Sequence, residues 1–200
     1  SACLVGSEMC IRDRNMTDLF DKDAKESVDN LSHKNIPLAE KLRPKVLDEV
    51  IGQDKALASD GQLKSMVKSG QLSSIIFWGP PGVGKTTLAR VIANEVSAHY
   101  EEISAIFSGV SDLKKLLTAA TVRHSNGLKT ILFVDEIHRF NKSQQDSFLP
   151  YMENGTITLI GATTENPSFE LNSALLSRSN VILLERLNAE DLRKIFNRAI

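Results

Sequence analysis

Five short apolar runs, each followed by a segment with helical spacing, constrain the fold of this chain more than any other feature. The runs are continuous rather than alternating and are bounded by Gly, Asp and Asn, which is typical of strands buried on both faces of a parallel sheet. Helices between them supply the crossovers that such a sheet requires. The sequence therefore predicts a doubly wound α/β domain with a five-stranded parallel sheet. The expected strands are 74–79, 100–105, 130–135, 156–163 and 180–185, and the expected helices are 85–98, 110–123, 142–154 and 171–178.

Two local patterns refine this expectation. Pro150 lies inside 142–154 and lacks the N–H that a helix interior needs, so we expect a kink or an early helix end there. Near the C-terminal end, Asn188 and Asp191 have the spacing of a helix cap, and apolar residues follow at helical spacing. We expect residues 187–200 to begin a further helical unit that this chain does not complete.

The first 36 residues are expected to lie outside the folded domain. Residues 1–15 hold both cysteines, Cys3 and Cys10, and show no signal- or transit-peptide pattern, so we interpret them as non-native, adapter-like sequence. Residues 16–36 are polar, which predicts a flexible leader before order begins near Pro37. The remaining chain has no cysteine, which argues against disulfides and zinc and favours a reducing cytoplasm.

Composition alone identifies no partner. The 200 residues, 42% of them hydrophobic, are enough for one domain that buries roughly 70% of its unfolded surface. No apolar stretch reaches the length of about 18 residues that a membrane span needs. The chain has 24 basic and 25 acidic residues, so any nucleic-acid contact would have to come from a local basic patch.

The string GPPGVGKT, from Gly79 to Thr86, fits the phosphate-binding pattern G-x-x-x-x-G-K-[ST] between an expected strand and an expected helix. Its glycines let backbone N–H groups turn toward phosphate oxygens, and the helix dipole adds about half a positive charge there. Lys85 is suited to the β and γ phosphates of ATP, and the Thr86 hydroxyl to Mg²⁺. The competing interpretation is a glycine-rich turn with a surface lysine. The predicted nucleotide-binding residues of the loop are Gly79, Pro80, Pro81, Gly82, Val83, Gly84, Lys85, Thr86 and Thr87.

Two adjacent acids, Asp135 and Glu136, end the expected strand 130–135. We expect this strand to lie beside the strand that carries the phosphate loop, so that both deliver their ends to one crevice. Asp135 would then hold Mg²⁺, directly or through water, and Glu136 would accept a proton from the water that attacks the γ phosphate. On its own such a pair is more often a solvated turn, but the phosphate loop favours the catalytic interpretation.

The next residues leave a second enzyme class open. His138 completes the string DEIH, which also matches the DExH box of superfamily 2 helicases. Those helicases place a second RecA-like domain after the first, and the residues that follow here are too few for one. A DExH-type helicase is therefore the alternative, and we interpret His138 as a structural or surface residue rather than a catalytic one.

Longer strings around these motifs resemble a known family. They are similar to AAA+ ATPases of the clamp-loader clade, and within it to the replication-associated recombination protein A family (RarA, also called MgsA), whose eukaryotic relative is the Werner helicase-interacting protein. The strings HRFNKSQQDSFLP and GATTENPSFELNSALLSR carry the resemblance more specifically than the ATP motifs do. The resemblance implies an AAA+ P-loop NTPase domain over 37–186 and the start of a helical lid over 187–200. The matching segments are 37–53, 79–93, 130–150 and 159–178.

The resemblance also implies contacts with the base of the nucleotide. The string LRPKVLDEVIGQ is similar to the segment that packs over adenine in this clade, which indicates Arg43, Val50 and Ile51, with Pro44 and Gly52 between and beside them. A simple core contact would also explain Val50 and Ile51. Both interpretations stay open for these two residues.

Two catalytic roles are implied by the resemblance alone. Thr164, with Thr163 as the fallback, is similar to the sensor-1 residue that orients the attacking water. Arg178 is similar to the arginine finger that reaches the γ phosphate bound by a neighbouring subunit, although Ser179 replaces the family's cysteine. A helix-end arginine can also simply offset the helix dipole.

Together these expectations describe an ATP- and Mg²⁺-dependent, DNA-stimulated ATPase that acts at stalled or damaged replication forks in DNA replication, recombination and repair. The resemblance implies DNA forks, ends or single-strand gaps as partners, a homo-oligomer formed through Arg178 in trans, single-strand-binding protein and replisome components, and a cytoplasmic, nucleoid-associated location without a membrane partner. Without the rest of the lid, this chain alone is expected to turn over ATP weakly. A clamp-loader-like subunit that binds ATP with little hydrolysis is the other alternative; it has no chemical need for the full set Lys85, Thr86, Asp135, Glu136 and Arg178.

Overall fold

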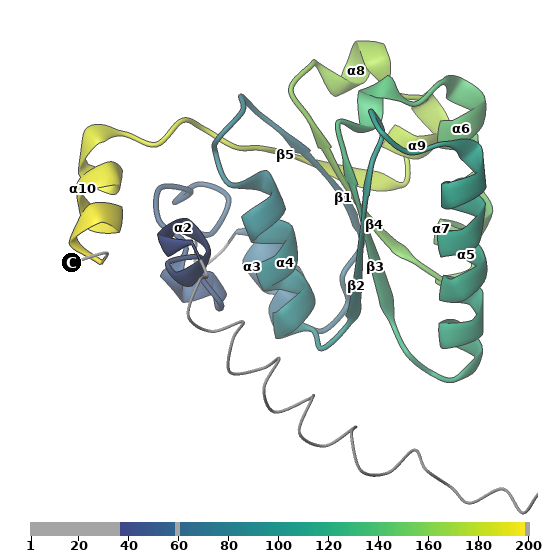
Figure 1. Ribbon diagram of the computed structural model, residues 1–200, viewed down its shortest axis with the longest axis horizontal. Helices are drawn as coiled ribbons and strands as arrows, with labels where there is room; N and C mark the ends of the chain where they lie inside the picture. Colours follow the sequence, from purple (N-terminus) through teal and green to yellow (C-terminus); the bar gives the residue numbers. More distant parts are fainter. Residues whose placement is uncertain (1–36, 59–60, 199–200) are drawn as a thin grey trace, which may run out of the picture. The chain divides into compact units, whose positions relative to one another are not determined.

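The computed structural model describes residues 37–58 and 61–198, so the expectations for residues 1–36 lie outside the described residues. From Leu42 onward, the described residues belong to one compact unit that contains the sheet (Figure 1). The helix α2 (Leu38–Lys41) precedes this unit in the chain. It is a single turn in which the N–H groups of Glu40 and Lys41 donate to the carbonyl oxygen of Pro37.

The predicted fold class is confirmed by a five-stranded sheet in the order β2-β3-β4-β1-β5, in which every neighbouring pair is parallel. Its central strands are largely apolar and mostly buried, because helices cover both faces. Each strand lies within two residues of its expected boundaries. The strands are β1 (Ser74–Trp78), β2 (His99–Ser104), β3 (Thr130–Asp135), β4 (Thr158–Thr163) and β5 (Ser179–Leu183).

One expectation about the sheet is wrong. The strand β3, which ends in Asp135, does not lie beside β1, because β4 lies between them and pairs through Ile160 with Ile75 on one side and with Phe133 on the other. A parallel crossover can skip a position in the sheet, so the order of strands along the chain does not determine their neighbours. The carboxyl ends of all these strands still meet at one edge. The end of β4 is therefore inserted between the phosphate loop and the two acids.

Helices cover the sheet in two layers (Figure 1). On one face, α3 (Gln62–Lys68) and α4 (Lys85–Glu95) pack against the sheet in a core that includes Phe77 and Leu88. On the other face, a core that includes Ile76 and Leu113 joins the sheet to a second layer of helices. Neighbouring residues of β1 thus supply opposite cores, as the alternation of side chains along a strand requires. The helices of the second layer are α5 (Val110–Ser125), α6 (Lys142–Asp146), α7 (Leu149–Glu153) and α9 (Ser173–Leu176).

The short helices begin and end where local chemistry dictates. The expected interruption at Pro150 is confirmed: the segment divides into α6 and α7, and Pro150 lies in the first turn of α7, where no helical N–H partner is required. Asparagine side chains accept a hydrogen bond at the start of α6, α8 (Pro167–Glu170) and α9, which satisfies helix N–H groups without partners within the helix. The described residues also form two 3-10 turns, η1 (Leu47–Glu49) and η2 (Ile137–Arg139).

The last described element is α10 (Ala189–Asn197), and its predicted cap is confirmed. Asn188 accepts from the N–H of Asp191, whose side chain accepts in return from the N–H of Asn188. Leu192 and Phe196 of this helix are exposed. The predicted boundary between a nucleotide-binding domain and a lid stays a prediction. No helix within 37–58 and 61–198 is long and apolar enough to cross a membrane.

Candidate active site

The phosphate loop connects the end of β1 to the start of α4. Gly82 and Gly84 have φ angles of +79° and +96°, a left-handed region that costs other residues roughly 1–2 kcal/mol. The space where a Cβ would lie is open at both positions, so the backbone conformation rather than crowding requires glycine. Because α4 begins directly after Gly84, its N-terminal N–H groups and dipole are presented to the loop.

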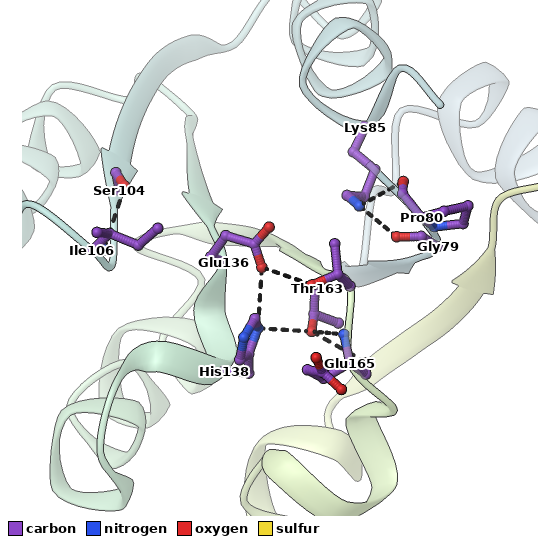
Figure 2. Close-up of polar contacts among 10 residues, drawn as sticks. Gly79, Pro80, Lys85, Ser104, Ile106, Glu136, His138, Thr163 and Glu165 are labelled. Atoms are coloured by element: carbon purple, nitrogen blue, oxygen red, sulfur yellow. Dashed lines mark hydrogen bonds and ion pairs between the residues drawn. The ribbon is translucent and has the colours of Figure 1, made fainter. Parts of the chain in front are cut away.

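Lys85 lies with its ammonium group inside the loop. Its Nζ donates to the carbonyl oxygens of Gly79 at 2.6 Å and Pro80 at 3.1 Å (Figure 2). Burial lowers the pKa of the Lys85 amine, and the nearby charges of Glu136 and Asp135 act in the opposite direction. These two bonds use two of the three ammonium protons, so the third is available to a phosphate oxygen.

The loop and the acids line one cleft of about 380 Å³. Asp135 ends β3, and burial raises the pKa of its carboxyl group, followed by the charge of Glu136. A cation in the cleft would offset both causes. Of the predicted phosphate-loop residues, Gly79, Pro80 and Val83 are outside the lining of this cleft, and Val83 belongs to a buried hydrophobic core. The lining consists of Arg43, Pro81, Gly82, Gly84, Lys85, Thr86, Thr87, Asp135 and Glu136.

Glu136 reaches the cleft from a strained turn. Its φ and ψ are 50° and 47°, which costs a residue with a side chain roughly 1–2 kcal/mol. Two features offset this cost: the carbonyl oxygen of Glu136 accepts the N–H of Arg139 at 2.8 Å, and the next side chain, Ile137, is fully buried. Observed strain of this kind is concentrated at functional sites.

The end of β4 joins the loop to the acids. The carbonyl oxygen of Thr163 accepts the N–H of Gly79 at 3.2 Å, and the hydroxyl of Thr164 donates to Glu136 Oε2 at 3.3 Å. Thr164 is therefore the threonine in direct contact with the acid. Thr163 is fully buried, and its hydroxyl lies next to His138 (Figure 2).

The predicted adenine contacts are only partly brought to this cleft. Arg43 lines it, whereas Val50 and Ile51 are half-buried and are absent from its lining among the described residues. Val50 packs against the core that includes β1 and α4, which is the simpler contact that the sequence left open.

Arg178 lies near the amino-terminal ends of the strands, whereas the phosphate loop lies at their carboxyl ends. Arg178 directly precedes β5, whose first residue Ser179 pairs with Ser74 at the start of β1. The loop follows the other end of β1, about 13 Å away at the usual rise of a strand. Arg178 instead donates through Nε to Glu153 at 2.7 Å and lines a separate cavity of about 280 Å³.

Two residues near the cleft carried no assigned role in the sequence. Gln53 is buried, donates to the carbonyl oxygens of Val83 and Glu185, and accepts the N–H of Glu185 at 3.2 Å. Its only sequence signal is a polar amide inside the string VIGQ. His138 is not a surface residue, because its side chain is 7% exposed and contacts Glu136. The string DEIH was its signal.

The geometry describes a phosphate-binding loop beside two carboxylates, the arrangement of a P-loop nucleotide-binding protein. Residues 75–187, more than half of the chain, match the ATPase family associated with various cellular activities (AAA). The chain belongs to the AAA family. This membership does not favour the DExH-helicase interpretation.

Three relatives make the resemblance more specific. The chain is 55% identical over 164 residues to replication-associated recombination protein A of Escherichia coli (strain K12), covering 82% of this chain and 37% of that protein. It is 48% identical over 164 residues to ATPase WRNIP1 of Dictyostelium discoideum, covering 82% of this chain and 19% of that protein. The structure of the Thermotoga maritima RuvB Holliday junction branch migration motor matches with a TM-score of 0.61 and 35% identity, covering 78% of this chain and 53% of that one. The resemblance to the replication-associated recombination protein A family is thereby confirmed. The chain spans 37% of the length of the Escherichia coli protein.

Proposed function

We propose that this chain is the nucleotide-binding domain of an oligomeric, DNA-dependent ATPase that acts at stalled or damaged replication forks. The observation that carries the ATPase part is the single cleft lined by Lys85, Thr86, Asp135 and Glu136. The replication part is supported by the relatives named for replication-associated recombination and by the RuvB branch migration motor.

The cleft suits a nucleotide triphosphate with a magnesium ion. The left-handed glycines and the N-terminus of α4 present N–H groups to anionic oxygens, and Lys85 adds a cation. Thr86 and Asp135 would hold Mg²⁺, because hydroxyl and carboxylate oxygens are the ligands it prefers. When bound, the ion would neutralise charge on the β and γ phosphates.

Glu136 is the proposed base. Its carboxylate borders the same cleft, and Thr164 holds its Oε2. It would accept a proton from the attacking water, while Thr164 orients the water or the carboxylate. Arg178 of a neighbouring copy would stabilise the charge that develops on the γ phosphate, which proposes a homo-oligomer.

The test replaces Glu136 with Gln in the full-length protein. We expect ATP to bind normally and turnover to fall by at least about 100-fold, because loss of a general base usually costs this much. Glu170→Gln, an exposed glutamate in α8, is the matched control and should leave the rate unchanged. Rates are measured with and without single-strand-gapped DNA, which should stimulate the wild type.

Each alternative outcome has a distinct meaning. Undiminished hydrolysis by the Glu136→Gln variant would remove the base assignment. A wild type that binds ATP but hydrolyses little under all conditions would instead favour the clamp-loader-like switch. A rate of ATP hydrolysis that is the same with and without DNA would support an ATPase but contradict its dependence on DNA.

A further inference from the structure

The side chain of His138 lies between the proposed base and the end of β4. Its Nδ1 is 3.2 Å from Glu136 Oε2 and 3.0 Å from Thr163 Oγ1, and only 7% of the side chain is exposed (Figure 2). The carbonyl oxygen of the same Thr163 accepts the N–H of Gly79 at the start of the phosphate loop. A continuous set of hydrogen bonds thus connects the loop, β4, His138 and Glu136.

The fold places His138 there through its neighbour Ile137. A Cβ at Gly161 of β4 would lie 3.0 and 3.2 Å from side-chain atoms of Ile137, and 2.8 Å from Ile76. Gly161 therefore lets the turn η2 approach β4 closely. Since Thr163 follows Gly161 by two residues on the same face of the strand, the next residue of the turn, His138, meets its hydroxyl.

The partners of Nδ1 select one form of the imidazole ring. The hydroxyl of Thr163 donates to the carbonyl oxygen of Glu165 at 3.2 Å and accepts the N–H of Glu165 at 3.1 Å. The same proton could instead point toward His138 Nδ1, so the contact with Thr163 does not by itself fix the form of the ring. A carboxylate oxygen can only accept, so the 3.2 Å contact between Nδ1 and Glu136 Oε2 requires a proton on Nδ1. With that proton on Nδ1, the Thr163 hydroxyl accepts from His138 and donates to Glu165.

We propose that His138 is a positioning residue that holds Glu136 for catalysis. Its Nδ1–H, shared between Glu136 Oε2 and Thr163 Oγ1, fixes one carboxylate oxygen against β4 and leaves the other oxygen for the attacking water. The Thr164 hydroxyl donates to the same Oε2. This inference rests on the proposed role of Glu136 as the base, and it assigns to His138 the orientation of that base rather than any contact with ATP.

The test compares three substitutions that differ in where they place an N–H. In His138→Asn the amide nitrogen occupies nearly the position of Nδ1, in His138→Gln it lies near the position of Nε2, and His138→Leu has no donor. We expect the Leu and Gln variants of the full-length protein to lose about 10- to 100-fold in kcat, the usual effect of losing a hydrogen bond to a charged group. The Asn variant should stay within about threefold of the wild type. ATP affinity, measured with a fluorescent ATP analogue, should change less than about twofold in all three.

The outcomes separate this inference from the proposed function. A wild type without ATPase activity removes the proposed function and the inference with it. An active wild type with an undiminished His138→Leu rate, or with equal losses in the Asn and Gln variants, overturns only the role of His138. A purely structural role predicts parallel losses of thermal stability and ATP affinity instead.

A spectroscopic measurement tests the hydrogen bond without turnover. Long-range ¹H–¹⁵N spectra of histidine-labelled protein distinguish a proton on Nδ1 from one on Nε2. We expect His138, assigned by the signal missing in the Asn variant, to carry a proton on Nδ1. An unprotonated Nδ1 would contradict the proposal even if the kinetic results agreed with it.

Discussion

At the scale of single residues, Gly84 and Glu136 adopt the same left-handed backbone for different reasons. Gly84 has no side chain, so a φ of +96° costs it little, and the loop can turn its N–H groups toward an anion. Glu136 has a side chain and still adopts a φ of 50°, because the buried Ile137 and the hydrogen bond from Arg139 hold the turn. The strained backbone of Glu136 directs its carboxylate toward the cleft.

We predict that Gly84→Ala weakens both folding and nucleotide binding. The left-handed φ should cost about 1 kcal/mol of unfolding free energy, and relaxation of the loop should lower ATP affinity by about tenfold or more. Gly127→Ala is the matched control, because Gly127 has a φ of +76°, has equally open space around it and lies outside the cleft lining. Urea unfolding and ATP titration should show similar destabilisation in both variants but weaker binding only for Gly84→Ala. Equal ATP affinities would contradict the prediction.

At the scale of elements, two buried carboxamides hold segments together in the same way at different places. Gln53 bonds to Val83 in the phosphate loop and to Glu185 after β5. Gln145 donates to the carbonyl oxygens of Phe140 and Glu170 and accepts the N–H of Asn172, which joins α6 to the segments around α8 and α9. Both side chains are at most 5% exposed. Only the first network includes the loop.

Gln145 serves as a control for the effect of Gln53 on nucleotide binding. Replacing either glutamine with Leu should lower the unfolding free energy by about 2–3 kcal/mol, because buried peptide groups lose their partners. Only Gln53→Leu should also weaken ATP binding, since it alone releases the carbonyl group of Val83. Chemical denaturation and nucleotide titration test both effects. If Gln145→Leu weakened ATP binding as much, general destabilisation rather than loop positioning would be the cause.

A pH-dependent contact joins β2 to α5. Burial tends to raise the pKa of Glu101, but hydrogen bonds from His99 and Arg123 and their charges outweigh it, so the pKa lies below its ordinary value of 4.5. A lowered carboxyl pKa contributes stability that is present above the ordinary pKa and is lost as the pH falls through the folded-state pKa. Neutral pH therefore retains the whole contribution.

We predict that Glu101→Gln lowers the unfolding free energy by about 1 kcal/mol at pH 7. The difference from the wild type should shrink below about pH 4.5, because the wild-type carboxyl group then becomes protonated. Glu185→Gln is the control: its ion pair with Lys55 is largely exposed, so it should have little effect at either pH. Urea unfolding at neutral and acidic pH measures both variants. A destabilisation that is independent of pH would contradict the electrostatic explanation.

At the scale of the whole molecule, one copy lacks a complete site if Arg178 is the arginine finger. Arg178 and the phosphate loop lie at opposite edges of one sheet, so Arg178 cannot reach a nucleotide bound by its own chain. An interface between two copies would bring the amino-terminal ends of the strands of one copy, with Arg178, to the nucleotide cleft of the other copy. The ion pair with Glu153 leaves Arg178 partly exposed at these strand ends.

We predict complementation between two inactive variants. Arg178→Ala should lose most turnover, since an arginine finger is worth about 10³- to 10⁵-fold, and Lys85→Ala should lose ATP binding. Mixed subunits should regain measurable ATPase activity, because some interfaces combine an intact cleft with an intact Arg178. Native mass spectrometry verifies that the variants assemble together. No recovery in verified mixed oligomers would count against a role in trans.

The elements and the local motifs follow from short stretches of sequence. Largely apolar runs define the central strands β1, β3 and β4, because both faces of these strands are buried. Glycine at positions 82 and 84 encodes the loop, because the left-handed backbone there favours it. Asn188 and Pro150 likewise act on their immediate neighbours. These are short-range effects, so a linear reading is sufficient.

How these parts meet depends on contacts between segments that are distant in the chain. In the folded chain, β4 lies between β1 and β3, and Arg178 lies at the end of the strands opposite Lys85. Gln53 contacts Glu185, which is 132 residues away in the chain. The fold also turns His138 inward between Glu136 and Thr163, where the sequence had left it without a catalytic role. The physical reason is that strand order and side-chain contacts depend on crossovers and packing between distant segments, which no local pattern of residues specifies.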